Sequence, residues 1–138
     1  LMMAGYIGTV ASPLLGALMA FLHVDLSVLP VWSVLVMLVW FIPLVGQIGM
    51  NPILAVALVA PVIPDAATLG VTPTSIVVAL TAGWILSGVS SPFTATTMLV
   101  GNFAGISSSQ VGRGWNGVFT VLCALLLSGW VVLYATFF

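Results

Sequence analysis

Residues 31–63 read VWSVLVMLVWFIPLVGQIGMNPILAVALVAPVI, two apolar runs separated by a short turn rich in glycine, asparagine and proline. The second run, Ile53–Ile63, would form a helix of only ~16 Å at ~1.5 Å per residue. A bilayer's hydrocarbon core is ~30 Å thick, so this run cannot cross it alone. The pattern favours a re-entrant hairpin: Val31–Gly46 enters, the turn lies within the membrane, and Ile53–Ile63 returns. The alternative is a complete crossing from Leu26 to Gly46.

The composition around this hairpin is that of an integral membrane protein. Of 138 residues, 62% are hydrophobic and 2% are charged, and the mean hydropathy is +1.38. Soluble domains carry ~25% charged residues because water must solvate their surface. The charged residues here are Asp25, Asp65 and Arg113, with His23 as the one histidine. Lipid must therefore cover most of the surface.

Long apolar runs, rather than alternating ones, predict an all-α fold and not a barrel. We expect a single transmembrane domain over residues 1–138, a polytopic bundle of about four or five membrane elements. The remaining expected elements are a span over Leu1–Leu22, surface turns around residues 23–30 and 64–73, a helix from Pro73 to about Val89, a further apolar stretch to Ile106, a polar loop over Ser107–Gly114 and a final span over Trp115–Phe138.

The stretch from Pro73 to Ile106 predicts a broken helix. Unbroken, it would be ~51 Å long, which is too long for one crossing. Within the polar segment Ser90–Thr97, the sequence Ser90-Ser91-Pro92 is where a break costs least, because proline removes one N–H group and hydroxyls can bond the freed carbonyls. We therefore expect the break to lie inside the membrane.

The two polar interruptions are the candidate binding site. A helix broken within the membrane exposes N–H groups that can hold an anion, and carbonyl and hydroxyl oxygens that can coordinate Na⁺. The alternative is that both are ordinary surface turns. The candidate residues for binding a substrate or ion are Gly49, Asn51, Pro52, Ser90, Ser91, Pro92, Thr94 and Thr96.

Several motifs resemble the ion transporter superfamily, which includes the divalent anion:sodium symporters and the membrane subunits of tripartite periplasmic transporters. Residues 49–58 (GMNPILAVAL) and 69–73 (LGVTP) are similar to that family's second hairpin and following loop. Residues 89–97 (VSSPFTATT) are similar to the unwound region of its broken helix. Residues 101–105 are similar to its Gly-rich run and residues 114–116 to the start of its last helix, and the shared order extends over about 90 residues.

This resemblance implies an elevator-type secondary transporter built from two inverted repeats, of which this chain is the second. It implies the inner membrane of a bacterium, a longer polypeptide and Asn51 at a hairpin tip, with Ser90, Ser91, Thr94 and Thr96 near a substrate or cation site. The symporters have Ser-Asn-Thr at the tip, where Met50 and Pro52 flank Asn51 here. The resemblance therefore leaves the solute and the coupling ion open.

The expected function is secondary active transport of a small anionic solute, coupled to Na⁺ or H⁺. We expect no cofactor apart from Na⁺ as a coupling ion. Expected partners are the lipid bilayer, the solute, and an N-terminal repeat, other membrane subunits or a second copy. The alternative is a non-transporting scaffold subunit of a larger membrane complex. We expect no enzyme activity, because no nucleophile–base pair, metal-ligand spacing or phosphate loop is present. Basic patches typical of nucleic-acid binding are also absent.

The remaining polar residues predict lesser roles. Arg113 is the one cation, and the positive-inside tendency places its loop in the cytoplasm. We expect His23 and Asp25 to be interfacial residues rather than a proton relay, and Asp65 to be a loop residue or a helix cap. The lone Cys123 offers no disulfide or metal framework.

Overall fold

The structure, a computed structural model, describes residues 2–23 and 25–138, and every regular element in those residues is helical. This confirms the all-α prediction. The elements are α1 (Met2–Phe21), α2 (Val31–Gly46), α3 (Pro52–Val59), the short 3-10 helix η1 (Ala60–Val62), α4 (Ala66–Leu69), α5 (Pro73–Ser90), α6 (Ala95–Ala104), the π-helical turn η2 (Gln110–Trp115) and α7 (Gly117–Phe137).

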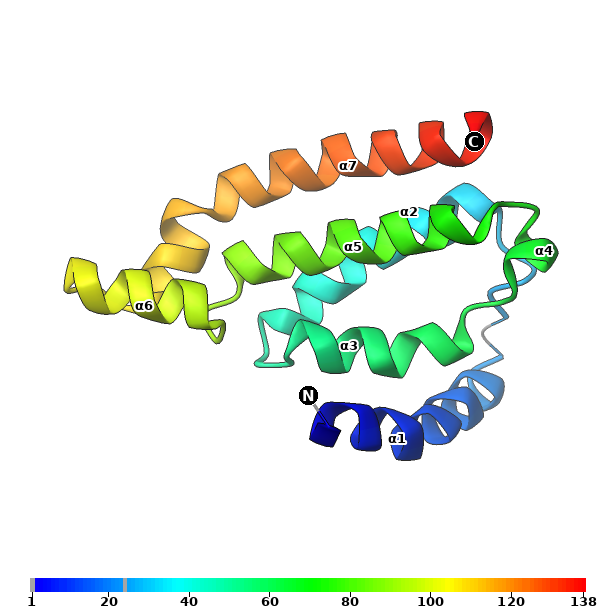
Figure 1. The fold of residues 1–138 in the computed structure, drawn as a ribbon, viewed down its shortest axis with the longest axis horizontal. Coiled ribbons are helices and arrows are strands. Elements are labelled where there is room, and N and C mark those ends of the chain that lie inside the picture. The colour runs from blue at the N-terminus through cyan, green and yellow to red at the C-terminus, as the bar shows by residue number, and fades with distance from the viewer. Residues whose placement is uncertain (1, 24) are drawn as a thin grey trace.

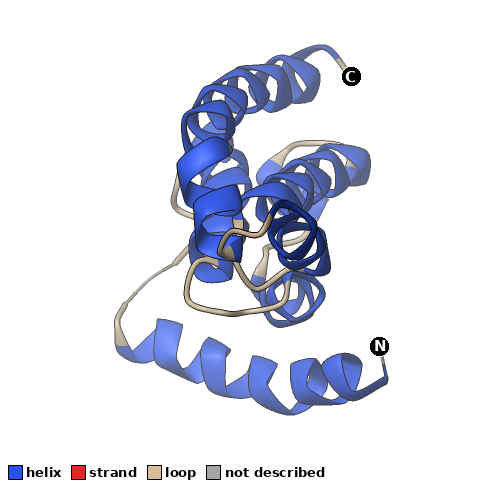
Figure 2. Ribbon diagram, turned by 90° about the vertical axis from the view of Figure 1, so that its left-hand side faces the viewer, coloured by secondary structure: helices blue, strands red, loops and turns tan. Residues whose placement is uncertain are grey.

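The helices α2, α3, α5 and α7 lie roughly along one direction (Figure 1). α2 and α3 form an antiparallel hairpin, and α5 runs the same way as α2, so that both end near the hairpin tip. α7 then returns to the other end of the bundle, while α6 extends beyond the tip. Figure 2 shows α1 from its side, lying across the lower face of the bundle.

The buried core joins α2, α5 and α7. Its central members are Leu35 and Val39 of α2, Ala79 and Leu86 of α5, and Val131 of α7. The close approach of α2 and α5 requires Gly83, because a Cβ there would lie 2.8 Å from the carbonyl oxygen of Leu38. α2 is therefore packed closely against α5.

Small residues let α1 pack on α3. A Cβ added at Gly8 would lie 2.8 Å from the Cβ of Ala57, and Ser12 is buried. The Ser12 hydroxyl donates to the carbonyl of Gly8 at 2.6 Å and lies 3.4 Å from that of Ala57. Small residues at four-residue spacing allow such close backbone contact between helices.

A helix over the whole of Leu26–Gly46, as the alternative crossing would need, does not form, because α2 begins at Val31. Asp25 accepts hydrogen bonds from the backbone N–H of Ser27 at 2.9 Å and from its hydroxyl at 2.6 Å. This local turn, followed by Pro30 in an extended conformation, keeps residues 26–30 out of the helix.

The prediction of a plain polar loop over Ser107–Gly114 is also wrong, since η2 is helical from Gln110 to Trp115. Val111 and Gly112 are buried, and Gly112 packs against the backbone of Ser90. Buried backbone groups need hydrogen-bond partners, and the wide turn supplies one by pairing the Asn116 N–H with the Val111 carbonyl at 3.1 Å.

Within residues 2–23 and 25–138, two helical stretches are long and apolar enough to cross a membrane, Pro73–Ala104 and Gly117–Phe137. The first contains the interruption between α5 and α6. Three shorter apolar helices accompany them, over Tyr6–Phe21, Val31–Gly46 and Pro52–Val62. The described residues are thus helical, and the length and composition of two stretches would allow them to span a membrane.

Candidate binding site at the hairpin tip

The hairpin tip is a tight turn between α2 and α3. Gly49 has φ of +100°, a conformation that glycine adopts without steric cost. The Met50 N–H donates back to the Val45 carbonyl at 3.2 Å. Asn51 then caps α3, because its side-chain oxygen accepts from the Ile53 N–H at 2.8 Å, and Pro52 occupies the first helical position.

The break between α5 and α6 spans residues 91–94, and the adjacent hydroxyls bond to the backbone. Ser90 donates to the Leu86 carbonyl at 2.7 Å, and Thr94 donates to the Gly88 carbonyl at 2.9 Å. Thr97 donates to the Ser91 carbonyl at 2.7 Å. The predicted compensation of freed carbonyls by hydroxyls is therefore confirmed. These hydroxyls keep only their lone pairs for a ligand.

The tip and the break meet, although they are far apart in the sequence. The buried Ser91 hydroxyl donates to the Gly46 carbonyl at 2.6 Å. The Gln47 side chain donates to the Ser90 hydroxyl at 3.2 Å. Gly46 packs closely against α5, because a Cβ there would collide with the Ser87 hydroxyl unless that side chain rotated away. Four helix ends thus converge: the C-termini of α2 and α5 and the N-termini of α3 and α6.

We call the place where the hairpin tip meets the break between α5 and α6 the crossing. A cavity of about 280 Å³ lies there. It is lined by Gly49, Met50, Asn51, Pro52, Ile53, Trp84, Gly88, Ser91, Phe93, Thr94 and Ala95. None of these side chains is charged. Asn51 and Thr94 are the N-cap residues of α3 and α6, so two helix N-termini border one cavity. Helix N-termini carry positive partial charge, which favours an anion.

Five of the eight predicted site residues line this cavity: Gly49, Asn51, Pro52, Ser91 and Thr94. The other three do not. Ser90 faces Gln47 on another side of the tip, Pro92 is buried beside the break, and Thr96 is exposed on the first turn of α6.

Sequence reasoning missed polar residues that hold the break in place. The Asn116 amide donates to the Val89 carbonyl at 2.9 Å. Arg113 donates to Gln47 twice, from Nε to the side-chain oxygen at 3.1 Å and from Nη2 to the carbonyl at 2.9 Å. The sequence offered one signal for these residues, namely that amide and guanidinium side chains are rare in it. Such side chains between apolar runs need hydrogen-bond partners.

In residues 2–23 and 25–138, no three His, Cys, Asp or Glu side chains lie close enough together to hold a metal ion. A cation at the crossing would instead contact neutral oxygens. The carbonyls of Gly46 and Ser91 lie there, and each accepts hydrogen bonds already.

No protein-family model, curated protein or solved structure matches this chain.

Proposed function

We infer that this chain is an integral membrane protein that forms part of a secondary active transporter for a small anion. The observation that carries this proposal is the contact between the interrupted helix and the hairpin tip. An uncharged cavity lies there, Asn51, Ser91 and Thr94 contribute polar side chains to its lining, and two helix N-termini border it. Paired interruptions of this kind are the best sequence-level pointer to a transporter's binding site.

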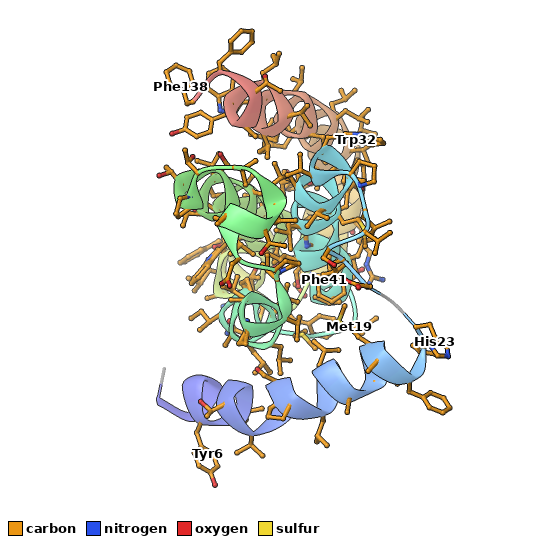
Figure 3. All side chains as sticks on the ribbon, turned by 90° about the vertical axis from the view of Figure 1, so that its right-hand side faces the viewer. Tyr6, Met19, His23, Trp32, Phe41 and Phe138 are labelled. Carbon is orange, nitrogen blue, oxygen red and sulfur yellow. The ribbon has the colours of Figure 1, made fainter. Side chains whose placement is uncertain are left out.

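The surface supports a lipid environment. α7 exposes large apolar side chains along its length, among them Phe119, Leu122, Leu126, Trp130 and Leu133. Its 21 residues give a length of ~32 Å, close to the ~30 Å hydrocarbon core. Tyr6 and Phe138 point away from the bundle on opposite sides (Figure 3). The charged residues are exposed and lie on connecting segments or in η2.

The site's electrostatics favour an anion. Thr94 makes no side-chain cap bond, so the first N–H groups of α6 have no side-chain acceptor. α3 contributes mainly its dipole, since Pro52 has no N–H and Asn51 occupies that of Ile53. Each N-terminus acts as roughly half a positive charge. No carboxylate lines the cavity, so no full negative charge opposes an anion there.

Coupling to Na⁺ would use the other two helix ends. The C-termini of α2 and α5 bring the Gly46 carbonyl and the Ser91 hydroxyl together at 2.6 Å. Helix C-termini carry negative partial charge, and unwound carbonyls coordinate Na⁺ in transporters with broken helices. The arrangement supports a cation beside the anion, with an N-terminal repeat or a second copy completing the transporter.

The test is protection of a single cysteine at Met50, which lines the cavity and leaves the Asn51 cap intact. Met50→Cys in a Cys123→Ala background is expressed in membranes and treated with a membrane-impermeant thiol reagent from each side. We expect labelling that succinate, acetate or phosphate slows, with or without Na⁺. Thr96→Cys, exposed and outside the cavity, is the matched control and should label equally in all conditions.

The opposite result has a clear meaning. If Met50→Cys labels freely and none of these anions changes its rate, the cavity is not an anion site. The result would then favour the alternative function, a non-transporting scaffold subunit of a larger membrane complex. The assay also reports which side of the membrane the tip faces, and so tests the predicted cytoplasmic location of Arg113.

A further inference from the structure

The length of α7 locates one boundary of the membrane. Its 21 residues carry no charged side chain and extend ~32 Å, close to the ~30 Å of a hydrocarbon core. Directly before α7, in η2, Arg113 and Trp115 are exposed. Arginine and tryptophan side chains prefer the region where lipid meets water. One membrane boundary therefore coincides with the N-terminal end of α7.

The crossing lies at the level of this boundary. Arg113 donates to the side-chain oxygen of Gln47 at 3.1 Å and to its carbonyl at 2.9 Å, and Gln47 belongs to the hairpin tip. The side-chain amide of Asn116, the N-cap residue of α7, donates to the Val89 carbonyl at 2.9 Å, just before the break. Both interruptions are therefore within hydrogen-bond distance of the residues that precede α7.

The lengths of α2 and α5 lead independently to the same level. α2 has 16 residues and extends ~24 Å, and α5 has 18 residues and extends ~27 Å. Both begin at the far end of the bundle, after the connections that carry Asp25 and Asp65, and both end at the crossing (Figure 1). If the crossing lay at the centre of the hydrocarbon, ~15 Å from either boundary, the beginnings of both apolar helices would protrude into water.

The surface at this end of the molecule has the composition of a membrane interface. Ile48 of the tip, Phe93 of the break and Phe103 of α6 are exposed, and so is the polar Asn102 of α6. Arg113 is the sole lysine or arginine in the chain and lies at this end. Apolar and aromatic side chains beside a cation fit the boundary between acyl chains and phosphate headgroups.

We propose that this end of the molecule, with the exposed side chains of Ile48, Phe93, Phe103, Arg113 and Trp115, lies in the headgroup region of one leaflet. The crossing is then at the membrane surface, not within the hydrocarbon as the sequence led us to expect. This inference rests on the proposed membrane location. For the proposed anion site it means that the solute reaches the cavity from the water on the Arg113 side, without entering hydrocarbon.

The test is depth-dependent fluorescence quenching of the full chain in phosphatidylcholine vesicles. Ile48→Cys, Phe103→Cys and Leu126→Cys, each in a Cys123→Ala background, are labelled with an environment-sensitive fluorophore. The vesicles carry a nitroxide either on the headgroup or in the middle of the acyl chain. Leu126, exposed at the middle of α7, is the matched control. We expect the ratio of headgroup to mid-chain quenching to exceed one at Ile48→Cys and Phe103→Cys, and to fall below one at Leu126→Cys.

Each other result has a definite meaning. A ratio below one at Ile48→Cys or Phe103→Cys would place that position within the hydrocarbon and overturn the inference. If neither lipid quenches Ile48→Cys while the control is quenched, protein or bulk water covers the tip, which also overturns it. If neither lipid quenches Leu126→Cys, the proposed membrane location itself fails, so the two failures are distinguishable.

Discussion

Ser87, in the last turn of α5, and Ser91, the C-cap residue that follows α5, should respond differently to the same substitution. Ser87 is 0% exposed and Ser91 is 1% exposed, so replacing either by alanine removes one buried hydroxyl from a similar place. The Ser91 hydroxyl donates to the Gly46 carbonyl at 2.6 Å and accepts from the Phe93 N–H at 3.2 Å. The Ser87 hydroxyl has no partner among the described residues.

The expected magnitudes follow from these contacts. Ser91→Ala loses two hydrogen bonds and leaves the Phe93 N–H unpaired, whereas the Gly46 carbonyl still accepts from Gly49 at 3.2 Å. Interhelical hydrogen bonds in membrane proteins average ~0.6 kcal/mol, and an unpaired buried group adds to that loss. We expect Ser91→Ala to lower the free energy of unfolding by about 1–2 kcal/mol. Ser87→Ala should leave it unchanged or raise it by up to ~1 kcal/mol.

The assay is reversible unfolding of the purified chain in mixed micelles with a rising fraction of sodium dodecyl sulfate, followed by circular dichroism. Each variant is compared with the wild type at equal protein and detergent concentration. Equal midpoints for the two variants, or a lower midpoint for Ser87→Ala, would refute the argument. In that case the contact between tip and break does not stabilise the fold.

Three further outcomes are expected. Gly83→Ala should destabilise the chain by about 1–3 kcal/mol in the same assay, because its Cβ would lie 2.8 Å from a backbone oxygen of α2; Gly129→Ala, with no atom within 4 Å, should be neutral or stabilising, and equal losses would contradict the close packing. Asn51→Ala removes the cap of α3 and should cost ~1 kcal/mol of unfolding free energy; an unchanged unfolding midpoint would show that this cap does not stabilise α3. The Asp25 pKa should lie below its ordinary 3.8, because the hydroxyl and then the backbone N–H of Ser27 donate to its carboxylate. The contribution of Asp25 to stability is therefore present above that value and is lost as pH falls. Ser27→Ala should raise this pKa in an NMR titration, and an unchanged pKa would show that the hydroxyl bond is absent.

The hairpin and the broken helix were predictable because each leaves a local signature. The run Ile53–Ile63 is too short to cross a bilayer, and its start at Asn51-Pro52 is a common helix beginning. The break at Ser90–Thr97 was predicted a few residues too long. Because α6 begins at Ala95, Thr96 and Thr97 belong to a helix. Helix boundaries depend on capping geometry, which the sequence indicates only approximately.

The candidate site was less predictable, because side-chain direction depends on which face of a helix meets a neighbour. Ser90 and Ser91 are adjacent, yet Ser91 lines the cavity at the crossing and Ser90 faces Gln47. Neighbouring residues at the end of a helix point in different directions, ~100° apart in regular helix, so the two serines contact different sides of the tip. The pairing of Gln47 with Arg113 joins residues 66 positions apart and has no local signal.

The amino-acid sequence by itself determined the helical class, the places where helices stop and the scarcity of charge. Proline, glycine and hydropathy act over a few residues, so these features can be read locally. The tertiary structure alone decided that the two interruptions meet, that α1 lies across the bundle and that Arg113 reaches the hairpin tip. In helices that are apolar on every side, hydrophobic periodicity no longer distinguishes the packed face from the exposed one. Shape, small residues and buried hydrogen bonds decide it, and these require the neighbouring helix to be in place.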